Sequence, residues 1–254
     1  ETLRENVTEV LRRNRAIGEL CKEYGIKLTS AEKKEISEFI KNAKAAYETG
    51  GMTFEEAIAK SYMTEYSLNY VQRITALWQK LYDYMTSEAN GIIKAGDDAV
   101  RKDIPVNFRR IRYVMISCDG NDDRGEKLAL AETVRNKALS GVDFVSLVKE
   151  YGEDQTMALS PDDGYYYTVG GIVRKVEDEA EKLDENGGIS GVIDMQNAFF
   201  VIQRLPIDDD YVEKHFETFR KNYAARLFNE ILDKKAASVV IKITDEEAYK
   251  ELLG

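Results

Sequence analysis

Histidine and cysteine are scarce in this chain of 254 residues, which has one histidine (His215) and two cysteines (Cys21 and Cys118). A structural zinc site takes about four Cys or His ligands, and a disulfide framework takes a set of paired cysteines, so neither is predicted. The two cysteines fall in segments that we assign to different domains, and we expect both to be buried or half-buried thiols that act as small hydrophobic residues. We expect no metal and no cofactor.

Basic residues are outnumbered, and long apolar runs are absent. Lys and Arg total 36 against 46 Asp and Glu, a formal net charge of −10, which argues against a nucleic-acid partner because phosphate binding needs a basic surface. No stretch approaches the roughly 20 apolar residues that span a bilayer. The chain opens directly in a helical pattern without an apolar leader, and this says nothing about its compartment, because an export signal can be removed by processing.

The few prolines mark changes in composition. Pro105 and Pro206 bracket a middle segment, which we place at residues 108–206. Residues 1–107 are predicted to be helical, the middle segment alternates strands and helices, and residues 207–254 return to helix. The predicted fold class is therefore α+β, with the middle segment inserted in a helical body.

The helical segments show apolar residues at helical spacing. Thr53 with Glu56 resembles a capping box. A longer helix carries a stripe that is either a core face or a groove for a client polypeptide: Tyr66, Tyr70, Ile74, Leu77, Trp78, Leu81 and Met85. The helix predicted over 211–235 has too broad an apolar face to stand alone, so we expect it to pack on the first segment. A terminal helix is expected from Asp245.

The middle segment begins with an alternating strand over 109–118, in which Tyr113 and Met115 share one face. Further strands are predicted over 164–168, 189–193 and 198–204. The ordered stretches SGVDFVSLVKEYGED, GYYYTVGGIV, LDENGGISGVID and NAFFVIQRLP resemble a parvulin-type peptidyl-prolyl isomerase domain. The flanking helices, with YGIKLTSAEKKEI near the start, resemble the chaperone domain of SurA/PrsA-type foldases, in which a parvulin module is inserted.

The resemblance implies a set of site residues. Parvulins of this kind carry two histidines, and the matching positions here are Tyr113 and Phe200, so both histidines are replaced. The family's acidic or thiol position matches Asp154. With Tyr113, it is the candidate catalytic residue. The residues expected to bind the peptide and the proline ring are Met115, Met157, Tyr166, Ile172, Val176 and Phe200.

Two interpretations of the activity follow from these replacements. In one, Tyr113 restores part of the hydrogen-bond network and the domain isomerises X–Pro bonds. In the other, the domain binds peptide with weak or no catalysis. A third interpretation is a non-catalytic structural module that forms a homodimer through its helical segments.

The resemblance also implies partners and a location. The partners are unfolded or newly exported polypeptides, and no nucleic acid or metal is expected. The location is extracytoplasmic, in the periplasm or on the outer face of the cytoplasmic membrane. Contact with the membrane would be through a lipid anchor upstream of Glu1.

Overall fold

The computed structural model describes residues 2–48, 51–118 and 123–242. The chain forms two compact units, of which one combines residues 1–95 with 221–254 and the other comprises residues 96–220. The second unit is therefore inserted in the sequence of the first. The terminal helix predicted from Asp245 lies outside the described residues.

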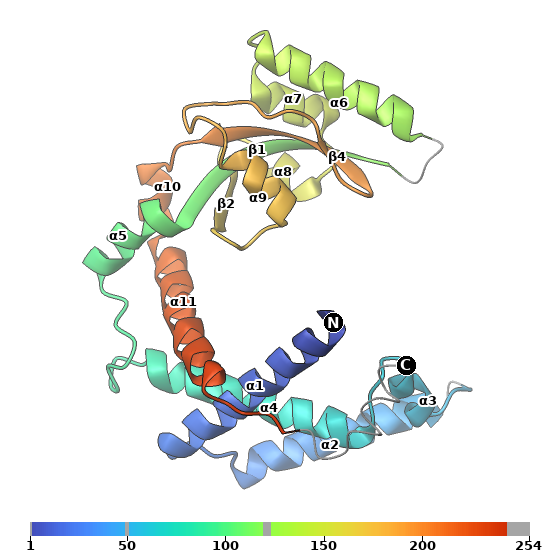
Figure 1. Ribbon diagram of the computed structural model, residues 1–254, viewed down its shortest axis with the longest axis vertical. Helices are drawn as coiled ribbons and strands as arrows, with labels where there is room; N and C mark the ends of the chain where they lie inside the picture. The colour runs from blue at the N-terminus through green and yellow to red at the C-terminus, as the bar shows by residue number, and fades with distance from the viewer. Residues whose placement is uncertain (1, 49–50, 119–122, 243–254) are drawn as a thin grey trace. The chain divides into compact units, whose positions relative to one another are not determined.

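The first unit is helical. It contains α1 (Thr2–Glu23), α2 (Ser30–Glu48), α3 (Phe54–Ala59), α4 (Glu65–Thr86) and most of α11 (Phe216–Ala237) (Figure 1). Its core joins both ends of the chain, because Phe228 and Leu232 of α11 are fully buried against Leu81 and Met85 of α4 and Leu20 of α1. The prediction that the last long helix packs on the first segment is confirmed.

The aromatic stripe of α4 divides along its length. Leu81 and Met85 are fully buried, and Trp78 meets Phe228 edge to face with ring centroids 5.6 Å apart. At the other end of α4, the side chains of Tyr66 and Tyr70 are 83% and 37% exposed. The stripe is thus core in its second half and surface in its first.

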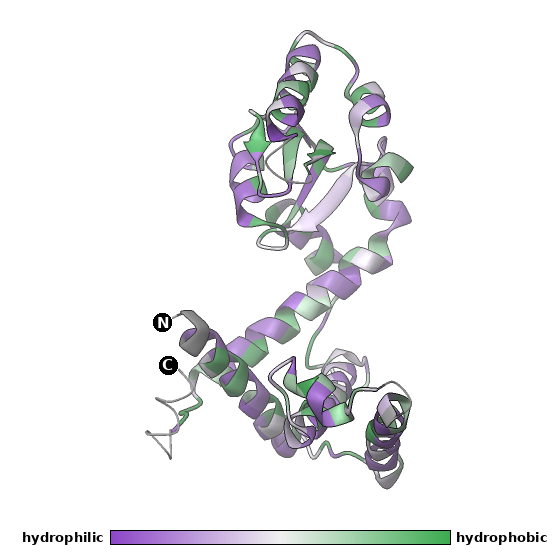
Figure 2. Cartoon of the chain, turned by 90° about the vertical axis from the view of Figure 1, so that its right-hand side faces the viewer, coloured by the Kyte–Doolittle hydropathy of each residue, from purple (hydrophilic) through white to green (hydrophobic). Residues whose placement is uncertain are grey.

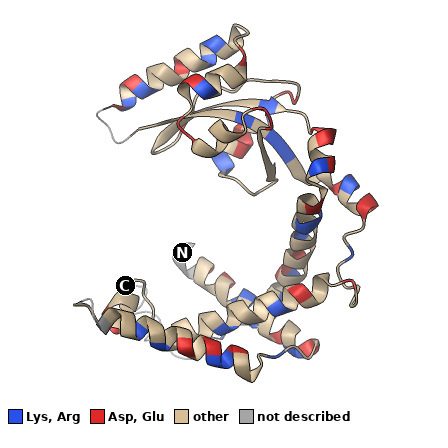
Figure 3. Cartoon of the chain, turned by 180° about the vertical axis from the view of Figure 1, so that it is seen from behind, with Lys and Arg blue, Asp and Glu red and all other residues tan. Residues whose placement is uncertain are grey.

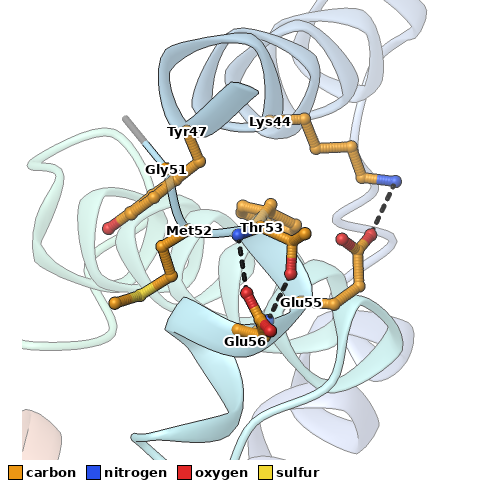
Figure 4. Close-up of a pocket in the computed structure, with 8 residues that line it drawn as sticks. Lys44, Tyr47, Gly51, Met52, Thr53, Glu55 and Glu56 are labelled. Carbon is orange, nitrogen blue, oxygen red and sulfur yellow. Dashed lines mark hydrogen bonds and ion pairs between the residues drawn. The ribbon is translucent and has the colours of Figure 1, made fainter. Parts of the chain in front are cut away.

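Side-chain caps set where the short helices begin. Thr53 and Glu56 form the predicted capping box at the start of α3, where each side chain binds the other residue's backbone N–H (Figure 4). Thr29 caps α2 through the N–H of Glu32 at 3.2 Å. The hydrogen bond from Lys80, followed by those from Thr29, lowers the pKa of Glu32 to about 2.

The second unit is an α+β unit, as predicted. Its elements are α5 (Asp97–Asn107), β1 (Phe108–Ser117), α6 (Arg124–Leu139), α7 (Phe144–Tyr151), α8 (Gln155–Leu159), β2 (Tyr165–Thr168), α9 (Arg174–Ala180), β3 (Ile193–Asp194), β4 (Ala198–Leu205), α10 (Asp209–Lys214) and the start of α11. The strands form one sheet in the order β2-β1-β4-β3, and every pairing is antiparallel. Pro105 lies inside α5 rather than in a linker.

The strand predicted over 189–193 is shorter than expected. Only Ile193 and Asp194 form β3, while Ile189 makes an isolated bridge to Gln203. The side chain of Ser190 accepts a hydrogen bond from the N–H of Ile202 at 2.9 Å. Because a side chain takes this donor, the backbone ladder is interrupted there.

Each face of the sheet has its own hydrophobic core. Helices α6 and α7 cover one face through Val134 and Leu147, which pack on Val114 (Figure 1). Helix α9 covers part of the other face through Val176 and Ala180. Alternation along β1 therefore separates two layers, and odd-numbered residues of this strand face the α9 side.

None of the described helices combines the length and the apolarity needed to cross a membrane. Hydrophilic residues interrupt the hydrophobic ones along the long helices (Figure 2).

Candidate functional site

Strands β1 and β4 bring three of the predicted site residues together. Met115 pairs directly with Phe200, and Tyr113 pairs with Ile202, one step along the same face. The rings of Tyr113 and Phe200 lie 5.6 Å apart at an angle of 54°. All three predicted side chains, Tyr113, Met115 and Phe200, are half-buried, so they form the partly exposed part of the α9 face of the sheet.

Asp154 reaches this group because its segment runs along an edge of β1. Strand β2 pairs with β1 only as far as Ile111, and beyond that point the N–H of Glu153 donates to the carbonyl of Met115 at 2.9 Å. The turn into this segment needs Gly152, because a Cβ there would lie 2.5 Å from the carbonyl oxygen of Val148. The chain thus places Asp154 beside Tyr113.

Asp154 accepts two hydrogen bonds through the same oxygen. Its Oδ1 accepts from the backbone N–H of Met157 at 2.7 Å, which caps α8, and from the hydroxyl of Tyr113 at 3.2 Å. Burial, and then the charge and hydrogen bond of Asp154, raise the pKa of Tyr113 well above its usual value near 10. The hydroxyl therefore stays protonated at neutral pH and acts as a donor.

Ile172 and Val176 lie on the same side of the sheet. Val176 is 9% exposed and belongs to the cluster beneath α9 with Ile111 and Ile202. Ile172 is half-buried and packs against that cluster, and so do Tyr113 and Phe200. These two aliphatic residues therefore share an apolar layer with the predicted aromatic ones.

Two predicted residues take other places. Met157 is 3% exposed and lies in the core beneath α6 and α7, so its side chain is packing. Tyr166 points to the opposite side of β2, where its ring stacks on Tyr211 with centroids 4.1 Å apart. Its hydroxyl accepts from the N–H of Asp208 at 3.2 Å, and burial raises its pKa to about 12. The structure does not bring Tyr166 to the group around Tyr113.

Tyr165 takes the place that sequence reasoning gave to its neighbour. It pairs with Ile111, so its side chain shares the face of Tyr113. The two rings meet nearly perpendicularly, with centroids 6.4 Å apart, and Tyr165 is 37% exposed. Tyr165 is identified by the register between β1 and β2. The sequence of three consecutive tyrosines does not reveal that register.

The charges on β1 are confined to its first half. Arg109, Arg110 and Arg112 give the strand its basic stretch (Figure 3), and the strand has no charged residue from Tyr113 to Ser117. Arg109 pairs with Glu181 at 2.8 Å, and Arg204 pairs with the same carboxylate at 3.1 Å. Asp154 is thus the charged side chain in contact with Tyr113.

The described part of the chain contains no candidate metal site. No group of three or more His, Cys, Asp or Glu side chains there could hold a metal ion. Cys21 and Cys118 are both buried and free, as predicted.

Comparison with protein families gives one match, in which residues 113–205 match the family Rotamase, described as PPIC-type PPIASE domain. A comparison with curated proteins finds no match.

Similar solved structures include foldase and parvulin proteins. The foldase protein PrsA from Streptococcus pneumoniae is 21% identical, with 98% of this chain and 90% of that chain covered and a TM-score of 0.41. PrsA from Bacillus anthracis is 17% identical, with 96% and 100% covered and a TM-score of 0.37. NmPin, the parvulin of Nitrosopumilus maritimus, is 27% identical, with 39% and 97% covered and a TM-score of 0.33. Each of these TM-scores lies below 0.5.

Proposed function

We propose that this chain is a foldase that binds unfolded polypeptides and isomerises X–Pro bonds in them, because its residues 113–205 match the PPIC-type, or parvulin, peptidyl-prolyl isomerase domain. The observation that carries the proposal is the contact of Tyr113 with Asp154 at 3.2 Å beside the half-buried ring of Phe200. It combines one carboxylate with an apolar surface, and X–Pro isomerisation needs little more.

The reaction is rotation about a partial double bond. The cis and trans forms of an X–Pro bond differ by only about 0.5–1 kcal/mol, but the barrier is roughly 18–20 kcal/mol because rotation breaks the amide resonance. In the twisted state the carbonyl is less polarised than in either planar state. An apolar surface that removes water from the bond therefore favours the twisted state over the planar ones. Phe200, Ile172 and Met115 supply such a surface.

The charge of Asp154 also lowers the barrier to rotation. A carboxylate near the carbonyl oxygen of residue X repels it most in the planar states, where that oxygen carries more negative charge. Repulsion is weaker in the twisted state, so the barrier falls. Tyr113 holds the carboxylate in place by its hydrogen bond. We assign Asp154 the role of the charged group and Tyr113 that of a positioning residue.

The replaced histidines favour a second candidate, which is peptide binding without catalysis. Phe200 stands at a family histidine position and offers a ring in place of a hydrogen-bonding group. NMR exchange spectroscopy on proline peptides separates the two candidates. Acceleration of cis-trans exchange above the spontaneous rate supports the foldase proposal, and peptide-induced shifts with no acceleration support the binding candidate.

The helical unit supports the polypeptide-binding part of the proposal. Val7 and Val10, three residues apart on α1, are 48% and 56% exposed. A hollow of about 320 Å³ lies between α1 and α4, and it is lined by Val10, Arg13, Asn14, Ile17, Ile74, Thr75 and Trp78. An apolar surface of this kind suits the exposed side chains of an unfolded chain.

A client-aggregation assay tests this part. The intact chain should slow the aggregation of an unfolded client, and a Val10→Glu variant should protect less because it puts a charge on the apolar surface. The matched control is Val240→Glu, at a residue that is 78% exposed and is not among those that line the hollow. Equal protection by Val10→Glu and the control would place client binding elsewhere, and no protection by the intact chain would remove this part of the proposal.

We further propose an extracytoplasmic location, in the periplasm or on the outer face of the cytoplasmic membrane, and newly exported polypeptides as the clients. The support is the family resemblance of the whole arrangement, in which an isomerase domain is inserted in a helical unit. Fractionation of cells that express the full-length protein tests the location. Recovery with cytosolic markers would contradict it.

A further inference from the structure

We infer that Tyr165 sets the preference of this site for the residue that precedes proline, and that the preferred side chain is aromatic or large and aliphatic. The inference rests on the proposed function and names the substrate class of the same site. It starts from β2, where the three consecutive residues Tyr165, Tyr166 and Tyr167 point alternately to the two faces of the sheet.

The three tyrosines have different surroundings. Tyr167 is 4% exposed and belongs to the core beneath α9. Tyr166 is stacked on Tyr211 on the other side of the sheet. Tyr165 is 37% exposed, and its ring centroid lies 6.4 Å from that of Tyr113 and 6.4 Å from that of Tyr167. Tyr165 is therefore the tyrosine of β2 that shares the Tyr113 face and can also offer ring surface to a bound chain.

Tyr165 also continues a row of rings. Phe200 contacts Tyr113 at 5.6 Å, and Tyr113 contacts Tyr165 at 6.4 Å. The row crosses from β4 over β1 to β2, so it extends away from Phe200 past the Tyr113–Asp154 contact. A peptide whose X–Pro carbonyl lies at that contact would place the side chain of residue X, which starts on the Cα next to the carbonyl carbon, within reach of the Tyr165 ring.

The chemistry of this row selects the occupant. Rings that meet edge to face or offset contribute beyond the area that they bury, so an aromatic side chain gains most and a large aliphatic one gains by burial alone. The charged neighbour is Asp154, which disfavours an acidic residue at X. Of the basic side chains of β1, those at positions 110 and 112 lie on the opposite face of the sheet, and the one at position 109 is paired with Glu181, so they do not offset that repulsion.

The test measures exchange rates and affinities by NMR on the full chain with four peptides that differ only in X, which is Phe, Leu, Ala or Glu. We expect kcat/KM to fall in that order, with Phe over Ala by about three- to tenfold. The Tyr165→Ala variant should bring the Phe-to-Ala ratio close to one, because the Phe peptide loses more than the Ala peptide does. Tyr165→Phe should keep the ratio, because the ring and not the hydroxyl makes the contact.

Leu139→Ala is the matched control, because Leu139 is 56% exposed on α6, a helix that covers the other face of the sheet. An unchanged Phe-to-Ala ratio in Tyr165→Ala, with wild-type activity intact, would overturn the inference and leave the proposed function standing. If the wild-type chain binds the peptides without accelerating exchange, the same ratio is taken from dissociation constants, and the inference is judged on them. Absence of both binding and acceleration would overturn the inference together with the proposed function.

Discussion

The hydroxyl of Tyr113 donates to Oδ1 of Asp154, a residue 41 positions later in the chain, at 3.2 Å. The same oxygen accepts the backbone N–H of Met157 and so begins α8. One carboxylate oxygen therefore caps a helix and holds the hydroxyl of Tyr113. The cap of α8 and the contact with Tyr113 are thus two hydrogen bonds to one oxygen of Asp154.

Removing the Tyr113 hydroxyl should weaken catalysis without unfolding the chain. Tyr113→Phe keeps the ring contacts with Phe200 and Tyr165 but deletes the donor to Asp154. Because a hydrogen bond to a charged group contributes about 1.5–3 kcal/mol when buried and less when half-exposed, we expect kcat/KM for X–Pro exchange to fall about three- to tenfold. NMR exchange spectroscopy measures it. Tyr166→Phe is the control, and an equal loss there would contradict the assignment.

The charge and the capping role of Asp154 can be separated by two substitutions. Asp154→Asn keeps a side-chain acceptor for the Met157 N–H, so stability should change little while exchange catalysis drops. Asp154→Ala removes the cap as well and should cost about 1 kcal/mol of unfolding free energy. Urea unfolding and NMR exchange on both variants provide the data. Full activity in Asp154→Asn would show that the charge plays no part.

The helical unit should depend strongly on Phe228, which is fully buried and meets Trp78 and Tyr82 edge to face. Phe228→Ala leaves a cavity and should lower the unfolding free energy by about 3–5 kcal/mol. Trp78 is the only tryptophan of the chain, so its fluorescence in urea reports this unit. Phe39→Ala, at a residue that is 52% exposed, is the control. A loss below about 1 kcal/mol in Phe228→Ala would mean that the core is not packed as described.

Alkaline pH should destabilise the inserted unit. Burial raises the pKa of Tyr167 to about 12, whereas tyrosine in an unfolded chain titrates near 10. The unfolded state therefore loses its proton first, and the stability due to the buried neutral phenol is lost as pH rises from about 10 to 12. The urea midpoint of the wild type should fall more steeply over this window than that of Tyr167→Phe. The fully exposed Tyr62 provides the control, Tyr62→Phe; if both variants follow the wild-type slope, Tyr167 is not buried as described.

Several features could be predicted because the information is local. The capping box of Thr53 with Glu56 needs two residues three apart, and the alternation of β1 is set within ten consecutive residues. The broad apolar face of the helix around Phe228 predicts that this helix packs on another element, and it packs on α1 and α4. Local patterns did not predict that the strand expected over 189–193 is interrupted. There the side chain of Ser190, in place of a backbone carbonyl, accepts the N–H of Ile202.

The site itself depended on contacts between distant segments. Strand period alone says that Tyr165 and Tyr166 point to opposite faces, but it does not say which of them shares a face with Tyr113. That depends on the pairing of Tyr165 with Ile111, which only the folded sheet sets. The resemblance likewise predicts Met157 at the site, and the fold places it in the core beneath α6 and α7.

The amino-acid sequence by itself determined the helical ends, the inserted α+β unit and the residue types at the family positions, because periodicity, capping and ordered motifs are properties of short stretches. Tertiary structure alone decided that Asp154 meets Tyr113 and that Tyr165 rather than Tyr166 stands beside them. The physical reason is that strand register and edge contacts join segments about 40 to 55 positions apart, and a shift of one residue in register moves every side chain of a strand to the opposite face.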